Sequence, residues 1–266
     1  DPITFGVDIV PTDEVAGAFV TGDLVFNNLE VFVPPTSNSF GVRIGNTGNK
    51  SIRRIRIANS TIYGGSPGIQ VIGNGARVDE LTLESTALYN PKTKGLTVWA
   101  NGATGRVTGL LLSNISIVSG SYVHSAMVLA GESGGAIESA QVVGGFIGDI
   151  GGGIDVWGKV VGLSVSNVSF FALPGPNIVP ASGAVTLNGH PTHSYPKSIS
   201  IMGNTHLPKD TEPSSKLDHM VVVYPGVCSV VVMGNTASLR GVAVSDRTGT
   251  ACPVGRKILE PNVVTP

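Results

Sequence analysis

The stretch Gly68-Ile69-Gln70-Val71 recurs through the chain and decides the expected fold. Its close copies are Gly41-Val42-Arg43-Ile44, Gly95-Leu96-Thr97-Val98 and Gly153-Ile154-Asp155-Val156, and its looser copies are Ser125-Ala126-Met127-Val128, Gly183-Ala184-Val185-Thr186, His219-Met220-Val221-Val222 and Gly241-Val242-Ala243-Val244. Subtracting the positions of successive first residues gives steps of 22 to 36 residues. A short strand that returns at such an interval is typical of a solenoid, in which each repeat stacks on its neighbours.

A second motif keeps step with the first one. It reads as strand, Asn turn, strand, and its copies are residues 55–62, 110–117 and 163–170, with Asn59, Asn114 and Asn167 in the turn. The segments Met202-Gly203-Asn204-Thr205 and Met233-Gly234-Asn235-Thr236 also repeat each other. Asn and Gly tolerate the left-handed conformation of a tight turn. The motif therefore predicts two short strands joined by a very short turn in every repeat.

Three short strands per repeat, stacked about eight times, predict an all-β parallel β-helix. Apolar residues alternate within the strands, as Ile55 and Ile57 do, which is the period of a half-buried strand. The coil length, the Asn-bearing turns and the loops of variable length resemble the right-handed β-helices of the pectate-lyase type. We expect residues 1–23 to form an N-terminal cap or partial coil, residues 24–258 the β-helix, and residues 259–266 a C-terminal tail.

Composition excludes several classes of function. Of the 266 residues, 17 are basic and 18 acidic, and no basic stripe points to nucleic acid. No apolar run approaches the ~18 residues of a membrane span. The Gly-rich segments do not follow phosphate-loop spacing, and acidic residues are too scattered for calcium, so we expect no cofactor and no metal. Cys228 and Cys252 lie about one coil apart, so stacked coils could bring them near enough for a disulfide if the protein is extracellular. The alternative is that both are small buried hydrophobic residues.

The Gly-x-x-Val strands predict which side chains point outward. If Ile69 and Val71 face the core, Gln70 and Ile72 face outward. The same count places outward Arg43, Thr97, Trp99, Met127, Leu129, Asp155, Trp157 and Leu187. Ile72, Trp99, Leu129 and Trp157 then form an apolar stripe, which should not face water. Either it packs laterally in a homotrimer, as in the trimeric viral tailspikes that the fold resembles, or Trp99 and Trp157 stack on sugars.

Asp155 is the first candidate for catalysis, because it is expected mid-strand on the sheet that carries the active site in pectate lyases and polygalacturonases. Glu132 and Asp149 are the neighbouring carboxylates. Glycosidases need two carboxylates, about 5–5.5 Å apart in retaining enzymes and about 6.5–9.5 Å in inverting ones. Adjacent strands lie roughly 4.8 Å apart, so Asp155 and Glu132 could meet either condition. A solvated or ion-paired strand carboxylate is the plainer interpretation.

A loop of residues 188–197 offers a second set of candidates. His193, with Tyr195 and Lys197 nearby, could supply the acid and base of a lyase. An ordinary polar loop is the alternative. The catalytic motifs of polygalacturonases and of calcium-dependent pectate lyases are absent from the sequence.

The resemblance implies a polysaccharide ligand, and we name Trp99, Trp157, Arg43, Gln70, Tyr195 and Lys197 as candidate binding residues. We expect an extracellular protein, secreted or on a virion surface, that binds and depolymerises a bacterial surface glycan as tailspikes do. A secreted polysaccharide lyase or glycoside hydrolase is the second possibility. A non-catalytic adhesin or structural solenoid is the third.

Overall fold

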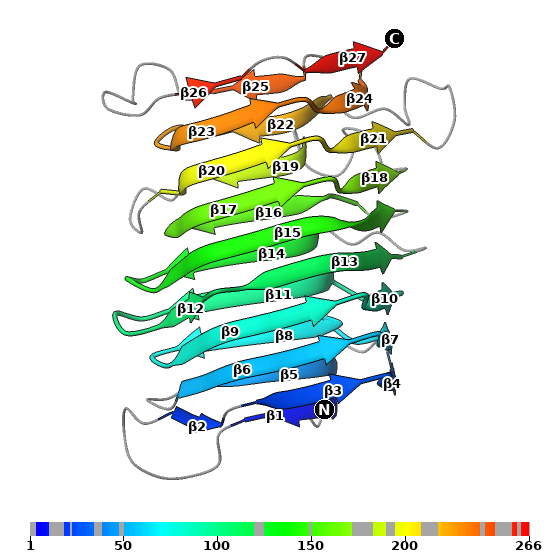
Figure 1. Ribbon diagram of the computed structural model, residues 1–266, viewed down its shortest axis with the longest axis vertical. Helices are drawn as coiled ribbons and strands as arrows, with labels where there is room; N and C mark the ends of the chain where they lie inside the picture. The colour runs from blue at the N-terminus through cyan, green and yellow to red at the C-terminus, as the bar shows by residue number, and fades with distance from the viewer. Residues whose placement is uncertain are drawn as a thin grey trace.

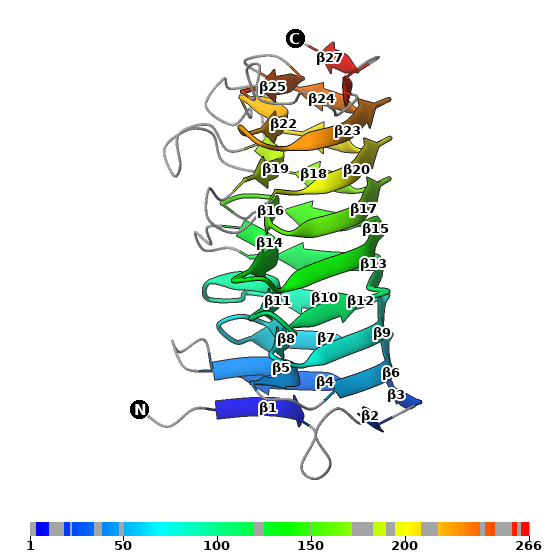
Figure 2. The same cartoon turned by 90° about the vertical axis from the view of Figure 1, so that its left-hand side faces the viewer.

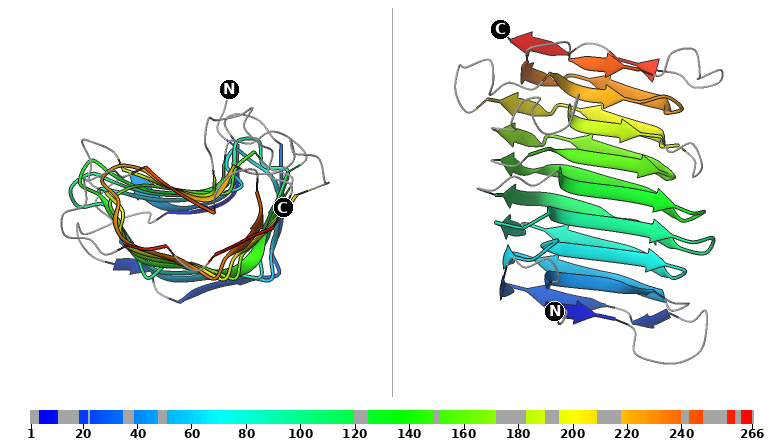
Figure 3. Two further views of the ribbon diagram at one scale, coloured as in Figure 1. Left: turned by 90° about the horizontal axis from the view of Figure 1, so that it is seen from above. Right: turned by 180° about the vertical axis from the view of Figure 1, so that it is seen from behind.

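The computed structural model confirms a right-handed parallel β-helix. The residues that it describes form no α-helix. These are residues 4–10, 19–21, 23–34, 39–47, 51–119, 125–148, 151–171, 183–189, 195–208, 218–239, 243–247, 257–259 and 262–265. Successive coils stack along one axis, with the two ends of the chain at opposite ends of the stack (Figure 1). Seen along that axis, the coils superimpose around a common interior (Figure 3, left).

One strand of each coil belongs to a nine-stranded parallel sheet, here called the first sheet. Its strands, in their order in space, are β1 (Thr4–Ile9), β5 (Ser39–Thr47), β8 (Ile69–Asn74), β11 (Lys94–Asn101), β14 (Ser125–Glu132), β16 (Ile154–Gly158), β19 (Gly183–Asn188), β22 (His219–Val223) and β25 (Val244–Asp246). Figure 2 shows these strands one above another, beside the rest of the coil.

The remaining strands form an 18-stranded sheet that bends around the other sides of the solenoid. The strands on its long side are β2 (Phe19–Thr21), β3 (Leu24–Asn27), β6 (Ser51–Ala58), β9 (Arg77–Glu84), β12 (Arg106–Thr108), β13 (Leu111–Val118), β15 (Ala136–Gly148), β17 (Val160–Ser166), β20 (Lys197–Met202), β23 (Cys228–Met233) and β26 (Lys257–Ile258). The strands on its short side are β4 (Glu30–Val33), β7 (Thr61–Gly64), β10 (Ala87–Tyr89), β18 (Ser169–Phe171), β21 (Thr205–Leu207), β24 (Thr236–Ser238) and β27 (Val263–Thr265). The ends of β13 and β15 complete this short side.

The coils continue into both segments that were expected to flank the β-helix. Strand β1 pairs with β5, and β2 pairs with β6, so residues within 1–23 contribute to the first coil. At the other end β27 pairs with β24. Cys252 lies outside the described residues, so its relation to Cys228 stays a prediction.

Alternation of apolar residues builds the core, as the sequence predicted. In one coil Ile69, Val71, Val78, Leu81 and Leu83 are all at most 1% exposed. The same positions in neighbouring coils stack on them and form one continuous hydrophobic core. Burial of these stacked Ile, Leu and Val side chains is the main favourable term for the fold.

The register corrects the alignment of the looser repeats. Leu96 pairs with Met127, so Gly95 is in register with Ala126 and not with Ser125. By the same reasoning the looser copies begin at Ala184, Met220 and Ala243 rather than at Gly183, His219 and Gly241. The shift reverses the expected direction of three side chains, since Met127, Leu129 and Leu187 point into the core with at most 1% exposure.

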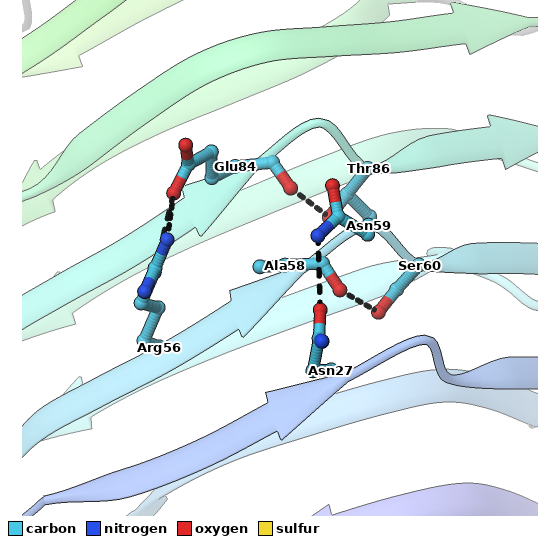
Figure 4. A network of polar contacts seen from close by, with 7 residues as sticks. All are labelled: Asn27, Arg56, Ala58, Asn59, Ser60, Glu84 and Thr86. Atoms are coloured by element: carbon cyan, nitrogen blue, oxygen red, sulfur yellow. Dashed lines mark hydrogen bonds and ion pairs between the residues drawn. The ribbon is translucent and has the colours of Figure 1, made fainter.

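The predicted Asn turns stack on one another along the solenoid. Asn59, Asn114 and Asn167 have φ values of 49°, 52° and 57°, as a left-handed turn requires. The Asn59 side chain donates a hydrogen bond of 2.9 Å to the Asn27 carboxamide one coil below (Figure 4). Beside this turn Arg56 forms an ion pair of 2.6 Å with Glu84 of the next coil. Such exposed pairs contribute little to stability.

Asn204 and Asn235 have a different role from the one that their repeat suggested. Gly203 and Gly234 hold the left-handed position, with φ values of 64° and 65°. The Asn that follows turns inward and is at most 1% exposed. Asn204 Nδ2 donates to Asn235 Oδ1, and Asn235 Nδ2 donates to Asn262 Oδ1, both at 2.9 Å. These three residues form an asparagine ladder through the last coils, in which Asn204 and Asn235 are buried and Asn262 is half-buried.

The short side of the solenoid carries an apolar row on its outer surface that sequence analysis missed. In coil order the row contains Phe32, Tyr63, Tyr89, Val118, Gly148, Phe171 and Leu207. Phe32 and Tyr63 stack with ring centroids 4.6 Å apart, and Tyr63 and Tyr89 stack at 5.3 Å. Phe32 is 67% exposed and Leu207 62% exposed. We call this row the short-side apolar row.

Candidate functional site

Two neighbouring rows of side chains on the outer surface of the first sheet hold half of the candidate residues. We call the first the Trp row. In coil order it contains Gly45, Ile72, Trp99, Ala130, Trp157, Asn188, Tyr224 and Arg247. The second, the Asp155 row, lies two residues earlier on each strand. It contains Arg43, Gln70, Thr97, Val128, Asp155, Thr186, Val222 and Ser245.

The Trp row corrects the predicted apolar stripe. Leu129 and Leu187 are core residues with 0% exposure, and Ile72 is only 7% exposed. Ala130 and Asn188 take the outward places that were predicted for Leu129 and Leu187. The surface therefore alternates between large and small side chains and is not a continuous apolar band. The oligomeric state itself stays a prediction.

Both tryptophans remain on this surface, but they differ in exposure and support. Trp99 is half-buried, and its indole Nε1 donates a hydrogen bond of 3.1 Å to Glu132 Oε2 on strand β14. The indole therefore reaches across to β14, where Ala130 is the residue in register with it. Trp157 is 40% exposed. A large aromatic side chain this exposed on a regular strand is well suited to bind a ligand through its ring.

A third aromatic residue, Tyr224, continues the row. The Arg247 guanidinium lies 5.3 Å from the centre of its ring and donates a hydrogen bond of 3.3 Å to its hydroxyl. The predicted binding residue Tyr195 is close by, because its ring lies against two glycines next to this row. Gly189 follows Asn188 directly, and Gly226 lies two residues after Tyr224. A side chain on either glycine would collide with that ring, so the glycines make room for Tyr195.

Asp155 is held by two hydroxyl groups. The Ser125 hydroxyl of β14 donates to its Oδ2, and the Thr186 hydroxyl of β19 also bonds to the carboxyl group. Burial raises the pKa of Asp155 above its usual value, while these two hydrogen bonds and the Lys94 charge oppose the rise. A carboxyl group with a raised pKa retains its proton at higher pH, as a proton donor must.

The structure separates Asp155 from Glu132. Asp155 is in register with Val128, and Glu132 lies four residues farther along β14, roughly 13 Å along the strand. Their side chains also point apart, because Asp155 bonds to Ser125 at the start of β14 while Glu132 bonds to Trp99 at its end. The predicted pair therefore does not have the spacing of two glycosidase carboxylates.

The other predicted residues fall into three groups. Arg43 is engaged by Asp8 in an ion pair of 2.6 Å, and Gln70 is a half-buried member of the Asp155 row. Lys197 belongs to β20 of the other sheet, so it is not part of this surface. His193 and Asp149 lie outside the described residues.

Sequence analysis missed one buried titratable residue. His206 sits among core side chains with 1% exposure, in register with Phe170 and Ala237. Its Nδ1 lies 3.2 Å from the Ser238 carbonyl oxygen, and its Nε2 has no hydrogen-bond partner among the described residues. Burial lowers the pKa of His206 to about 4. The side chain is thus neutral at pH 7 and belongs to the core, not to the outer site.

In the part of the chain that the structure describes, no three His, Cys, Asp or Glu side chains gather as metal ligands. Nor does this part contain a helix with the length and apolar character to cross a membrane.

Comparison with known proteins finds likeness only at the level of the fold. No protein-family model matches the chain, and no curated protein does. Among solved structures, alginate lyase from Paenibacillus sp. str. FPU-7 has a TM-score of 0.44 and 12% identity, covering 98% of this chain and 99% of that one. The A-module of the Azotobacter vinelandii mannuronan C-5 epimerase AlgE6 has a TM-score of 0.36 and 13% identity, covering 97% of this chain and 88% of that one. Similarity at this level does not extend to function.

Proposed function

We propose that the protein binds a polysaccharide along the outer surface of the first sheet. The observation that carries this proposal is the Trp row, in which Trp99, Trp157 and Tyr224 stand in line on one regular surface. Aromatic rings bind the apolar faces of sugars, while nearby polar groups bind sugar hydroxyls. Gln70 and Asn188, both half-buried, supply such groups beside the rings.

Replacement of Trp157 tests the binding surface. Trp157→Ala should weaken glycan binding by about tenfold or more, because exposed Trp side chains at the centre of an interface often contribute about 2 kcal/mol. Binding is measured by affinity electrophoresis and titration calorimetry against a panel of bacterial and plant polysaccharides. Phe32→Ala is the matched control, since it removes an exposed aromatic ring from the short side. Equal loss in both variants, or none in Trp157→Ala, would contradict the proposal.

Cleavage of the bound glycan is the second part of the proposal, and Asp155 is its candidate proton donor. The raised pKa and the position two residues from Trp157 favour this role. Protonated Asp155 would transfer its proton to the glycosidic oxygen as the bond to the anomeric carbon breaks. Water then adds its hydroxide to that carbon, and its remaining proton restores the acid form of Asp155.

Asp155→Asn distinguishes cleavage from binding alone. The variant should retain glycan affinity but lose the formation of new reducing ends. Ultraviolet absorbance of unsaturated products would identify a lyase instead of a hydrolase. Glu132→Gln is the control, because Gln can still accept the Trp99 hydrogen bond, and it should leave cleavage unchanged. If wild type releases no product from any bound glycan, the protein is a binding module.

Location and assembly complete the proposal. A glycan of the bacterial surface is met outside the cell, so we propose an extracellular, tailspike-like protein. For the expected homotrimer, the short-side apolar row replaces the predicted stripe as the lateral contact, since Phe32 and Leu207 are its most exposed members.

A further inference from the structure

The aromatic members of the Trp row are regularly spaced. Trp99 is in register with Ala130 and Ala130 with Trp157, so two coil steps separate the tryptophans. Trp157 is in register with Asn188, and Tyr224 follows in the next coil because its N–H bonds to the Leu187 carbonyl. Two further steps therefore separate Trp157 from Tyr224. Aromatic rings occupy every second coil, and a small or polar residue occupies each coil between them.

The spacing fixes a length. Neighbouring strands lie about 4.8 Å apart, so the Cα atoms of the three aromatic residues stand roughly 10 Å apart along the solenoid axis. This matches the length of one disaccharide unit in an extended chain of 1,4-linked sugars. In a chain with two residues per turn, every second sugar presents the same ring face to the same side. A chain with three residues per turn would present that face at every third sugar and would miss the rings.

The residues around the rings favour contact with ring faces and hydroxyl groups over contact with charge. Arg43 is paired with Asp8, the Glu132 carboxylate accepts the Trp99 N–H, and Arg247 lies over one face of the Tyr224 ring. The Asn101 and Asn74 amides lie farther along the same strands, 3.4 Å apart. Amide groups both donate to and accept from sugar hydroxyls.

On the basis of the proposed function, we propose that the Trp row selects extended β-1,4-linked glycans with a two-residue repeat that lie parallel to the solenoid axis. Trp99, Trp157 and Tyr224 then stack on three successive disaccharides, with one ring on one sugar of each. The chain passes over Ala130 and Asn188 between them.

A shift of one ring tests the spacing without changing the number of rings. Trp157→Ala combined with Asn188→Trp moves the central ring by one coil and breaks the two-coil period. The probes are β-1,4-linked gluco- and manno-oligosaccharides of two to six sugars, with α-1,4-linked galacturonan oligosaccharides as the three-fold comparison. Titration calorimetry gives the affinities, and circular dichroism melting checks that each variant is folded.

Wild type should gain about tenfold in affinity with each added disaccharide and little with each single sugar. The shifted variant should bind the six-sugar probes about as weakly as Trp157→Ala alone. If the shifted variant binds like wild type, or affinity rises evenly with every sugar, the proposed period is wrong although the surface still binds glycans. Preference for the α-linked probes would also overturn it. Absence of binding to every glycan of the larger panel would instead remove the proposed function.

Discussion

The asparagine ladder gives a quantitative prediction about stability. The Asn235 side chain takes part in hydrogen bonds with the Asn204 N–H and Nδ2, the Ile201 and Met233 carbonyls and Asn262 Oδ1. Asn235→Ala removes all of them. The Asn204 N–H then loses its acceptor in a site with 0% exposure, which costs about 1–3 kcal/mol, and the other lost bonds cost about 0.5–1.5 kcal/mol each. The lower bounds of these five contributions sum to about 3 kcal/mol, so we expect a loss of at least that size.

Urea denaturation followed by circular dichroism measures this loss. Asn27→Ala is the matched control, because its side chain makes one exposed hydrogen bond with Asn59. It should lose less than about 1 kcal/mol. Similar losses of stability in the two variants would refute this reasoning. They would mean that loss of any Asn side chain has the same cost whether or not its hydrogen bonds are buried. A loss confined to the last coils should also appear as faster amide exchange in β21, β24 and β27, since solenoid coils contact mainly their neighbours.

Three further predictions concern pH, backbone conformation and assembly. His206 has a folded pKa of about 4 against 6.5 unfolded, so the unfolded chain binds more protons and stability should fall by about 3 kcal/mol as pH falls from 6.5 to 4. His206→Leu should lack this part of the pH dependence in urea titrations, and an unchanged difference between the two pH values would contradict it. Gly145→Ala should cost more than Gly102→Ala: both have positive φ, but only at Gly145 would a side chain collide with a backbone carbonyl, that of Ile115. Thermal melting compares the two variants. Equal decreases in melting temperature would mean that the positive φ alone, and not the collision, causes the loss of stability. Phe32→Ser with Leu207→Ser should reduce the mass measured by light scattering if the short-side apolar row joins subunits, whereas a wild-type mass of 27.3 kDa would rule out the trimer.

The general architecture could be predicted because its signals are local and repeated. Alternating residues such as Ile55 and Ile57, and turns such as that at Asn59, need only one coil of sequence to be recognised. The register between coils was harder. Gly95 is in register with Ala126, so the position tolerates a small side chain, and the nearby Ser125 was mistaken for the repeat. An error of one residue reverses a strand's faces, which is why Leu129 was placed outside.

The candidate site was predicted only in part. Trp99, Trp157 and Asp155 do share one surface, since their strands belonged to the best copies of the repeat. Glu132 did not meet Asp155, because sequence neighbours in adjacent coils can lie far apart along the strands. Tyr224 was missed because it follows the strand and its segment was misaligned. The short-side apolar row was missed because some of its strands, such as β10 and β18, are only three residues long. Such a strand supplies one side chain to the row and is too short to show a period.

The main-chain hydrogen bonds between coils have a consequence for how the ligand repertoire of such a surface can change. Distances along the axis are set by the backbone, so a ring can be moved only in whole strand spacings of about 4.8 Å. Substitution can exchange one permitted distance for another but cannot adjust it finely. A new glycan therefore fits such a row of rings only if its repeat length is close to a whole number of strand spacings.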